Sequence, residues 1–389
     1  MTVNNLAIAL NEQKEIIFFL LVKNNQMEIE KYFSAVNDPR DQSKISHLLT
    51  DIIGLSLIGT IAGCEGYDDI EEFGISRQQW LKKYLQLPHG IPSHDTIERV
   101  FESINPLEFN ACFMHWVREI FNRSDSDVLL HIDGKSNRRS GDEYKGKKML
   151  HAINVFAGES RLSLAQFKVD EKCNEITVLN PLLKTLDIKG QTVTIDAIAC
   201  QKDIAQAITD GQGYYVLAVK DNQPTLNEHI QTAFKTTPVA STHTTEEKNH
   251  GRIEKRTCSV ITDLRFIDEA VNWTALYCII CIDSTRIIKE QITTETRYYI
   301  SSQKQNASFF LNAIRSHWGI ENSLHWVLDV LFREDYCRKR KDNAAENFNI
   351  IRKMALNIIR NKKDGKKSLR RKRLNAAWDV DYLENLLTF

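Results

Sequence analysis

Apolar residues between positions 308 and 340 recur every three or four residues, which is the spacing of one face of a helix. The stripe consists of Phe310, Ile314, Leu324, Leu328 and Leu331. His317 and Glu321 fall inside it. An unpaired carboxylate on a face that packs into a core costs several kcal/mol, on the order of the penalty for a buried charge. The pattern therefore predicts one long helix, Ser308–Arg340, on which an arginine, a metal ion or a substrate holds Glu321.

Between residues 127 and 225, short apolar runs alternate with polar segments. The predicted strands span 128–135, 149–156, 162–169, 191–195 and 214–219, and the predicted helices span 175–186 and 202–208. Hairpin-connected strands followed by alternating strand and helix predict a mixed α/β sheet. Asp133 lies near the end of the first strand, and Asp196 follows the fourth. Because ligands of open α/β sheets bind at the carboxyl ends of strands, both aspartates are candidate site residues.

The segments on either side of this sheet have different patterns. Residues 27–122 are mostly helical in pattern. Past Gln223, a polar helix precedes alternating segments at 252–262, 273–282 and 294–301, which predict a β-rich insertion. The predicted division is an extension at 1–26, a helical domain at 27–122, a catalytic core at 127–225 and 306–360, the insertion at 226–305, and a basic tail at 361–389.

The chain has 389 residues, of which 42% are hydrophobic and 26% charged, a balance typical of a soluble protein with more than one domain. Its formal net charge is zero, so an interaction with nucleic acid has to rest on where the charges lie. The apolar segment 48–64 predicts a buried helix, and no run reaches the roughly 20 apolar residues of a membrane span. The scattered cysteines, without a secretory signal, predict free thiols in a cytoplasmic protein.

Basic residues are concentrated near the C-terminus. Residues 333–373 contain 16 Lys or Arg against 5 Asp or Glu, an excess of 11 in a neutral chain. Such a segment is either a solvated face or a track that binds phosphate groups. Its position directly after the predicted Glu321 helix favours the phosphate track. This interpretation predicts DNA binding that weakens steeply with salt.

Asp133, Asp196 and Glu321 would repel one another if they met at one point. They can stay ionised together when cations lie between them, and a hard, oxygen-seeking ion such as Mg²⁺ suits that role. Two such ions roughly 3.5–4 Å apart can activate an attacking oxygen and stabilise a leaving one in phosphodiester chemistry. An alternative is a zinc hydrolase that uses His317, Glu321 and His325, which are spaced four residues apart, although the stricter His-Glu-x-x-His signature is absent.

Several strings of residues follow one another in a particular order along the chain. They are Ile91–Thr96, His131–Lys135, Thr194–Ala197, Leu217–Gln223, His250–Glu254, His317–Trp326 and Ala344–Asn347. Through the order and spacing of these strings, the chain resembles DDE transposases of bacterial insertion sequences, most closely the H-repeat-associated proteins. The resemblance runs from about residue 28 to the C-terminus.

The resemblance implies an RNase H-like fold for the predicted sheet, with Asp133, Asp196 and Glu321 as a catalytic and metal-binding triad. It implies Mg²⁺ as the cofactor, with Mn²⁺ able to substitute. The implied reaction is cleavage at the ends of a mobile element and transfer of the cut strand to target DNA. The expected partners are therefore double-stranded DNA and a second copy of the chain in a synaptic dimer, at the bacterial nucleoid. An inactive or domesticated transposase that only binds DNA is the alternative.

The chain departs from a pattern of many related transposases, which place a Tyr, an Arg and a Lys at fixed distances from the catalytic Glu. Ile314, His317 and Leu328 occupy those positions here. Arg315 and His325 are candidates to replace the lost basic contacts. The full set of predicted DNA contacts is Lys135, Arg138, Arg139, Lys220, Asn222, Gln223, His250, Arg252, Arg315, His317, His325, Arg338, Lys339, Arg340 and Lys341.

Overall fold

The computed structural model describes residues 29–121, 128–142, 144, 146–169, 175–249, 251–289 and 291–388. The chain divides into two compact units. The helical unit comprises residues 1–123, 139–142 and 328–389, and the sheet unit comprises residues 124–138 and 143–327. The predicted extension at 1–26 lies outside the described residues. The predicted domain boundaries stay a prediction, and the structure groups the residues after 327 with the N-terminal helices.

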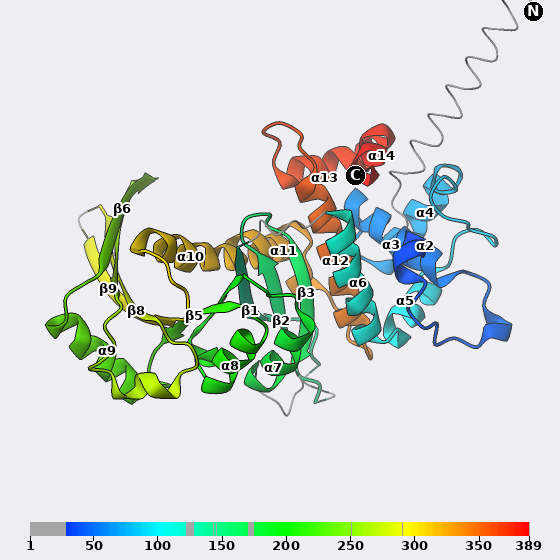
Figure 1. Ribbon diagram of the computed structural model, residues 1–389. Coiled ribbons are helices and arrows are strands. Elements are labelled where there is room, and N and C mark those ends of the chain that lie inside the picture. The colour runs from blue at the N-terminus through cyan, green and yellow to red at the C-terminus, as the bar shows by residue number, and fades with distance from the viewer. Residues whose placement is uncertain are drawn as a thin grey trace, which may run out of the picture. The chain divides into compact units, whose positions relative to one another are not determined.

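The helical unit combines helices from both ends of the chain (Figure 1). Its helices are α2 (Ile29–Phe33), α3 (Leu49–Ala62), α4 (Tyr67–Leu81), α5 (His94–Ser103), α6 (Pro106–Ile120), α12 (Ala344–Asn361), α13 (Leu369–Trp378) and α14 (Val380–Leu387). Short 3-10 turns lie at Gln42–Lys44 and Glu334–Tyr336. Helix α12 contacts α3, α5, α6, α13 and α14, and nearly all of its residues are buried. It is therefore the central helix of this unit.

Helix α3 confirms the buried helix predicted at 48–64. Every residue from Asp51 to Ala62 is buried. The carboxylate of Asp51 accepts hydrogen bonds from the backbone N–H groups of Gln86 and Leu87, at 2.9 and 2.7 Å, so this buried charge is satisfied. Among the described residues, no single helix is long and apolar enough to cross a membrane; α3 and α4 meet that criterion only jointly, across a bend of 94°.

Helices α13 and α14 occupy the segment that the sequence predicts to be a basic tail. Two cationic side chains of α13, Lys372 and Arg373, are buried. The Lys372 ammonium donates to the carbonyl of Ile359 at 3.2 Å, and the Arg373 guanidinium donates to the carbonyls of Thr60 and Leu331. These cations satisfy carbonyl groups at helix ends, which otherwise lack partners. Part of the basic excess thus stabilises the helical unit, which the sequence analysis did not predict.

Nine strands of the described residues form a single sheet in the sheet unit. They are β1 (Leu129–Asn137), β2 (Leu150–Ala157), β3 (Ser163–Val169), β4 (Thr192–Ile195), β5 (Tyr214–Val219), β6 (Ser241–Asn249), β7 (Arg252–Ile261), β8 (Cys278–Ile288) and β9 (Gln291–Ser301). Their order across the sheet is β3-β2-β1-β4-β5-β9-β8-β7-β6. Strand β4 runs parallel to β1 and β5, and the other neighbours are antiparallel. The predicted mixed α/β sheet is therefore confirmed.

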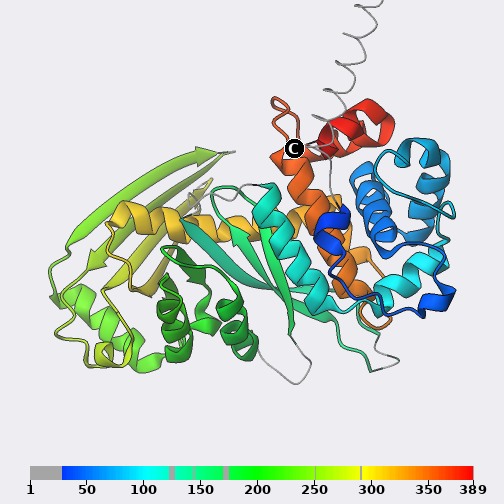
Figure 2. The same cartoon turned by 45° about the vertical axis from the view of Figure 1, so that its right-hand side comes forward.

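Helices cover both faces of this sheet (Figure 2). They are α7 (Glu175–Thr185), α8 (Lys202–Asp210), α9 (Pro224–Thr236) and α10 (Ala307–Ile320). Helix α10 lies along one face, where it contacts β1, β4, β6, β7 and β8, while α7, α8 and α9 lie on the other. A single helix therefore spans the first strands of the sheet and the strands added between residues 241 and 301.

The elements predicted between 127 and 225 are all present, with ends that shift by at most two residues. The three strands predicted in the β-rich segment correspond to β7, β8 and β9, but β8 begins at Cys278 because a turn, with a positive φ at Ala275, precedes it. Strand β6 was missed. Its sequence, Ser241–Asn249, contains no aliphatic or aromatic hydrophobic residue, and it pairs only with β7 at the sheet edge, so it lacks the apolar alternation of a half-buried strand.

The predicted single helix from Ser308 to Arg340 is wrong beyond Leu331, and it contains a π-helical turn that was not predicted. Helix α10 ends at Ile320, a π-helical turn spans Glu321–His325, and α11 spans Trp326–Leu331. Arg333 then has a φ of 49°, in the left-handed region, which does not continue an α-helix. The guanidinium of Arg373 donates to the carbonyl of Leu331 and so satisfies the end of α11. The stripe of apolar residues could not reveal these local changes.

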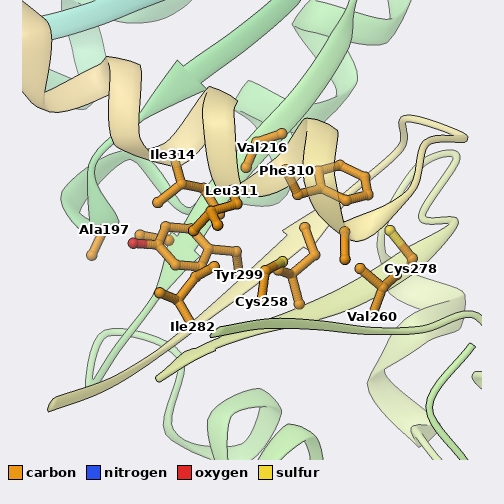
Figure 3. Close-up of a cluster of buried hydrophobic side chains, with 13 residues drawn as sticks. Ala197, Val216, Cys258, Val260, Cys278, Ile282, Tyr299, Phe310, Leu311 and Ile314 are labelled. Carbon is orange, nitrogen blue, oxygen red and sulfur yellow. The ribbon is translucent and has the colours of Figure 1, made fainter. Parts of the chain in front are cut away.

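A cluster of buried apolar side chains holds α10 on the sheet (Figure 3). Phe310, Leu311 and Ile314 of α10 pack against residues of four strands. The strand residues include Val216, Cys258, Val260, Cys278, Ile282 and Tyr299. Seven cysteines lie within the described residues and all are free thiols; the Cys-x-x-C pair of β8 is buried in the sheet. Apolar packing thus fixes the N-terminal half of α10 and delivers its C-terminal end to the candidate site.

Candidate functional site

The register of two parallel strands brings Asp133 and Asp196 together. Ile132 of β1 pairs with Ile195 of β4, and Asp133 and Asp196 are the next residues along each chain segment. Because neighbouring parallel strands lie about 4.8 Å apart, these two carboxylates emerge side by side. The sequence analysis placed Asp133 near the end of its strand. The structure shows that β1 continues to Asn137 by pairing with β2. Strand β4 ends at Ile195, so beyond this residue β1 has no β4 neighbour next to Asp133.

Glu321 is the first residue of the π-helical turn that follows α10. The expectation that it lies on a buried face is wrong, because its side chain is exposed. Ile314, His317 and Glu321 follow one another along the same side of the helix, and all three line a cavity rather than a packed core. A π turn inside an α-helix is a rare feature that is often associated with functional sites. The apolar stripe therefore lies on the side of the helix that faces the sheet, but at Glu321 this side borders the cavity.

The three predicted triad residues line one cavity of about 360 Å³. Residues from β5, α9, β9 and α10 complete its wall. The polar lining residues include Lys220, Asp221, Asn227, Gln231, Glu295, Arg297, Tyr298, Tyr299, His317 and Trp318. Arg297 lies over the ring of Trp318 at 4.8 Å from its centroid and donates to Glu295 at 2.7 Å. The cavity thus combines carboxylates with cationic and aromatic groups.

Electrostatics in the cavity disfavour the charge of Asp133. Burial, together with the neighbouring carboxylates of Glu321, Glu175 and Asp196, raises the pKa of its carboxyl to about 7, against the opposing effect of the hydrogen bond from the Gly134 N–H. Asp196 accepts a hydrogen bond from the backbone N–H of Ala197 at 2.7 Å. A cation bound among these groups would favour their ionised forms.

The donor set of Asp133, Asp196 and Glu321 suits a hard divalent cation, because it offers only carboxylate oxygens. Within the described part of the chain, no three His, Cys, Asp or Glu side chains lie close enough together to hold a metal ion. The same holds for the alternative zinc set of His317, Glu321 and His325. The residues therefore fit magnesium by chemistry, and they line a shared cavity without forming a closed set of ligands.

A buried polar group lies directly beneath the carboxylates, and the sequence analysis missed two of its three members. Thr194 Oγ1 lies 2.7 Å from His131 Nδ1 and 2.8 Å from His317 Nδ1. Burial lowers the pKa of His131 to about 3, helped by His317, and lowers the pKa of His317 to about 4 despite the opposing effect of Asp196. Both rings are therefore neutral at pH 7. The available signal was spacing, since His131 and Thr194 each precede a triad aspartate by two residues.

Asp133 has further polar neighbours that the sequence did not reveal. His325 Nδ1 lies 3.6 Å from Asp133 Oδ2, and its Nε2 lies 3.4 Å from the side-chain nitrogen of Asn154, the residue that pairs with Asp133 across β1 and β2. His325, predicted as a DNA contact, is buried. On the neighbouring strand, His151 joins Ser136 at 2.8 Å and Glu175 at 2.6 Å. Asp133 thus lies beside a set of polar side chains, several of which are hydrogen-bonded to one another.

Comparison with known proteins assigns the chain to a family. Residues 125–358 match the family described as Transposase DDE domain, and residues 30–117 match the family described as DDE_Tnp_1-associated. The first match spans more than half of the chain. The chain belongs to the DDE transposase family. This confirms the resemblance drawn from the sequence, including the H-repeat-associated proteins, since such proteins are among its relatives.

Two curated relatives illustrate the range of this family. The chain is 42% identical over 375 residues to the H repeat-associated putative transposase YhhI of Escherichia coli (strain K12), covering 93% of this chain and 98% of that protein. It is 43% identical over 77 residues to the inactive transposase YbfQ of the same strain, covering 19% of this chain and 92% of that protein. Among solved structures, a piggyBac transposase synaptic complex with hairpin DNA aligns with a TM-score of 0.43 at 12% identity, over 94% of this chain and 76% of that one.

The residues near the triad that were predicted to contact DNA differ in their surroundings. Lys220 lines the cavity, with its ammonium 3.9 Å from Asp196 Oδ1. The side chains of Asn222 and Gln223 instead donate to the carbonyls of Ala197 and Cys200, at 2.6 and 2.9 Å, and thereby hold the loop that follows Asp196. Their predicted contact with DNA stays a prediction.

Other predicted contacts in the sheet unit have acidic partners. Arg315 forms an ion pair with Glu247, and Arg252 forms one with Glu254 at 2.9 Å. Arg252 and Glu254 lie on the same strand, β7, whereas the pair of Arg315 and Glu247 joins α10 to β6. Lys135 is partly exposed and Arg138 is exposed, and His250 lies outside the described residues.

Most side chains of the basic segment 338–341 have partners within the helical unit. Lys339 donates to the carbonyl of Glu65 at 3.0 Å, Arg340 donates to the carbonyl of Arg139 at 3.0 Å, and Lys341 bonds Glu102 at 2.6 Å. Burial lowers the pKa of Lys339 to about 8. Arg338 is exposed. Arg338 is thus the member of this segment best placed to reach a phosphate group.

Proposed function

We propose that the chain is a metal-dependent DNA transposase that cuts DNA at the ends of a mobile element and joins the cut end to target DNA. Asp133, Asp196 and Glu321 are its catalytic and metal-binding residues in this proposal. The observation that carries it is that these three carboxylates, from β1, the end of β4 and the turn after α10, line one cavity. Membership of the DDE transposase family supports the same reaction class.

The proposed catalytic core is an RNase H-like fold. The strand order β3-β2-β1-β4-β5 supports this assignment. Strands β2 and β3 are antiparallel to their neighbours, and β4 and β5 continue parallel to β1. Helices α7 and α8 on the face opposite α10 fit the crossover connections that parallel strands require. In this arrangement the two strand aspartates lie at the centre of the sheet, next to the helix that carries Glu321.

The proposed cofactor is Mg²⁺, with Mn²⁺ as a substitute, held by Asp133, Asp196 and Glu321. When bound, it supplies charge neutralisation and activation of an attacking oxygen in phosphodiester chemistry. The chain's own residues hold the three carboxylates in place and present cationic groups to the substrate. Lys220 and Arg297 line the same cavity and are suited to bind DNA phosphates. The proposed partners are double-stranded DNA at the element ends and at the target, and a second copy of the chain during the reaction.

One specific observation favours a second candidate function. A relative that aligns with part of this chain is named an inactive transposase, so a family member that binds DNA without cutting it is a coherent alternative. The zinc hydrolase alternative has less support, because His317 is hydrogen-bonded to Thr194 and His325 lies beside Asp133.

The decisive experiment measures strand cleavage by the full-length chain on DNA that carries the repeats flanking its own gene. Wild type is expected to cut in Mg²⁺ and not in EDTA, and Glu321→Gln is expected to lose cleavage. The matched control is Asp221→Asn, because Asp221 is a carboxylate of the same cavity outside the proposed triad. It is expected to keep most of the activity.

Other outcomes of the cleavage experiment would contradict this proposal or support another function. Salt-sensitive DNA binding without cleavage by wild type would favour the inactive alternative. Cleavage that survives EDTA, or that requires Zn²⁺, would contradict the proposed mechanism. Equal losses in Glu321→Gln and Asp221→Asn would show that the cavity needs negative charge in general and not this triad in particular.

A further inference from the structure

Two polar layers lie one above the other at the centre of the sheet unit. Each of three elements contributes one residue to each layer: His131 and Asp133 from β1, Thr194 and Asp196 from β4 and its end, and His317 and Glu321 from α10 and its following turn. In a strand, residues two apart point to the same face, and in a helix residues four apart are neighbours on one side. The spacing therefore places the layer of His131, Thr194 and His317, here called the His-Thr-His layer, one step below the carboxylates.

A single hydroxyl joins the three elements in the His-Thr-His layer. His131 and Thr194 are paired residues of the β1–β4 ladder, with exposed fractions of 0% and 3%. Thr194 Oγ1 lies 2.7 Å from His131 Nδ1 and 2.8 Å from His317 Nδ1. A hydroxyl can donate one hydrogen bond and accept two, so it can serve both rings. The two rings meet edge to face, with centroids 5.7 Å apart.

We infer that Thr194 is a positioning residue, whose hydroxyl ties the end of α10 to β1 and β4 and thereby sets the distance of Glu321 from Asp133 and Asp196. The inference rests on the proposed function of those three carboxylates. Thr194 lines the same cavity as the carboxylates, and the role inferred for it acts through His317 and Glu321.

The rest of the packing of α10 cannot set this distance equally well. The cluster of Phe310, Leu311 and Ile314 is apolar, and apolar contacts are non-directional, so they tolerate small rotations and shifts of a helix. The hydrogen bond to His317 is directional and lies one helical turn before Glu321. The segment after Ile320 is a π turn, so this bond holds α10 just before the turn that carries Glu321.

The partner of Thr194 on β1 is itself fixed. A Cβ atom added to Gly158 would lie 2.7 Å from His131 Nε2 and 3.3 Å from the Leu129 Cβ. The imidazole therefore occupies space that a side chain at position 158 would fill. The hydroxyl is held between this buried ring on the sheet and the ring carried by α10.

The test measures Mn²⁺ affinity of the full-length chain by calorimetry, without DNA, together with thermal unfolding. Thr194→Val removes the hydroxyl and keeps the side-chain shape, and we expect it to weaken Mn²⁺ binding by about 10-fold, within the range seen when groups that orient metal ligands are removed. Thr194→Ser keeps the hydroxyl and is expected to bind within about 2-fold of wild type, a difference near 0.4 kcal/mol.

The matched control is Thr192→Val on the same strand. Thr192 is fully buried, and its hydroxyl accepts a hydrogen bond from Gln303 Nε2 at 3.1 Å, so its loss has a comparable structural cost. We expect Thr192→Val to unfold at a lower temperature and to keep the wild-type Mn²⁺ affinity. This separates positioning of the carboxylates from general stability.

The outcomes distinguish the inference from the function on which it rests. Wild-type affinity in a folded Thr194→Val chain, or an equal loss in Thr192→Val, would overturn the inference and leave the proposed function intact. Absence of Mn²⁺ binding in wild type as well as in Asp133→Asn would overturn the metal-dependent function itself. If Thr194→Val does not fold, His317→Met and His317→Gln test the same hydrogen bond from the helix, with the loss of affinity expected only for the Met variant.

Discussion

Ile132 of β1 and Ile195 of β4 form the last pair in the parallel ladder between these strands. The residue after each member of this pair is an aspartate. The structure therefore places Asp133 and Asp196 side by side where the ladder ends. Two carboxylates in that position disfavour one another's charge. A site built in this way gives up folding stability to hold negative charge, as functional sites commonly do.

Replacing one carboxylate should therefore separate stability from function. Asp133→Asn is expected to raise the melting temperature by a few degrees at pH 8 without divalent ions, because the carboxyl pKa of about 7 leaves it charged there against burial and its neighbours. The same substitution should abolish DNA cleavage. Adding Mg²⁺ should raise the melting temperature of wild type but not of the variant. A variant that is less stable than wild type under metal-free conditions would contradict this account of Asp133.

DNA binding by the C-terminal basic segment should depend on Arg338. This side chain is exposed, whereas Lys341 of the same segment is bonded to Glu102. Arg338→Ala is expected to weaken binding to duplex DNA and to reduce the slope of log affinity against log salt by about 1. Lys341→Ala serves as the control and should leave the slope unchanged. Fluorescence anisotropy over a salt series measures both, and equal effects of the two substitutions would refute the distinction.

The pH dependence of stability should report the burial of Lys339. Its ammonium lies 4.3 Å from the ring centroid of Tyr67 and 4.2 Å from that of Phe348, and burial lowers its pKa from 10.5 to about 8. The unfolded chain therefore binds more protons than the folded chain between pH 8 and 10.5. The contribution of Lys339 to the free energy of unfolding rises with pH across this window, and its cost is fully present below pH 8.

Lys339→Met should remove that rise. The measurement is denaturant unfolding at several pH values between 7 and 10.5, with the difference between variant and wild type plotted against pH. Lys363→Met changes an exposed lysine and is the control, for which we expect a flat difference. A flat difference for Lys339→Met as well would show that its ammonium is not held in a buried environment.

Arg373 should be among the most important single side chains for the helical unit. It is 7% exposed, its guanidinium lies 4.6 Å from the ring centroid of Phe332, and it donates to the carbonyls of Thr60 and Leu331. Arg373→Ala leaves these carbonyls unsatisfied and opens a cavity, so it is expected to lower the free energy of unfolding by about 3 kcal/mol. Arg371→Ala, at an exposed position of the same helix, should change it by less than about 0.5 kcal/mol.

The sheet was predictable because its strands carry apolar runs of ordinary length. The run that contains Asp133 and the run before Asp196 both correspond to observed strands, and the parallel register that joins them follows from the α/β pattern. Strand β6 was not predictable from the same signal. Its Thr, His and Glu residues belong to an edge strand whose faces are only partly covered, so no apolar alternation marks it.

The sequence indicated Asp133, Asp196 and Glu321 as candidate site residues, and all three line one cavity, but it did not indicate what surrounds them. Glu321 begins the turn after α10, and its exposure depends on a cavity formed by residues distant in sequence, such as Tyr298 and Asn227. The runs of basic residues misled in another way, because some side chains predicted to be exposed are buried. Lys339 and Arg373 look like phosphate ligands in sequence, yet both have carbonyl partners inside the helical unit. A count of charges cannot show which cationic side chains are buried.

Two glycines of the sheet unit should respond in opposite ways to the same substitution. At Gly158 an added methyl group would lie 2.7 Å from His131 Nε2, so Gly158→Ala forces the buried imidazole or the turn to shift. At Gly319 of α10 nothing lies within 4 Å of the added atom. Overpacking typically costs about 1–3 kcal/mol, whereas an alanine in place of a glycine inside a helix contributes about 0.5–1 kcal/mol of stability.

Denaturant unfolding of both variants tests this contrast. Gly158→Ala should lower the free energy of unfolding, and Gly319→Ala should raise it. Because Gly158 fixes the ring that holds Thr194, its substitution should also weaken Mn²⁺ binding, while Gly319→Ala should not. A Gly158→Ala chain with wild-type stability and wild-type Mn²⁺ affinity would show that the His131 ring has room to move, and would remove one support of the positioning role assigned to the Thr194 hydroxyl.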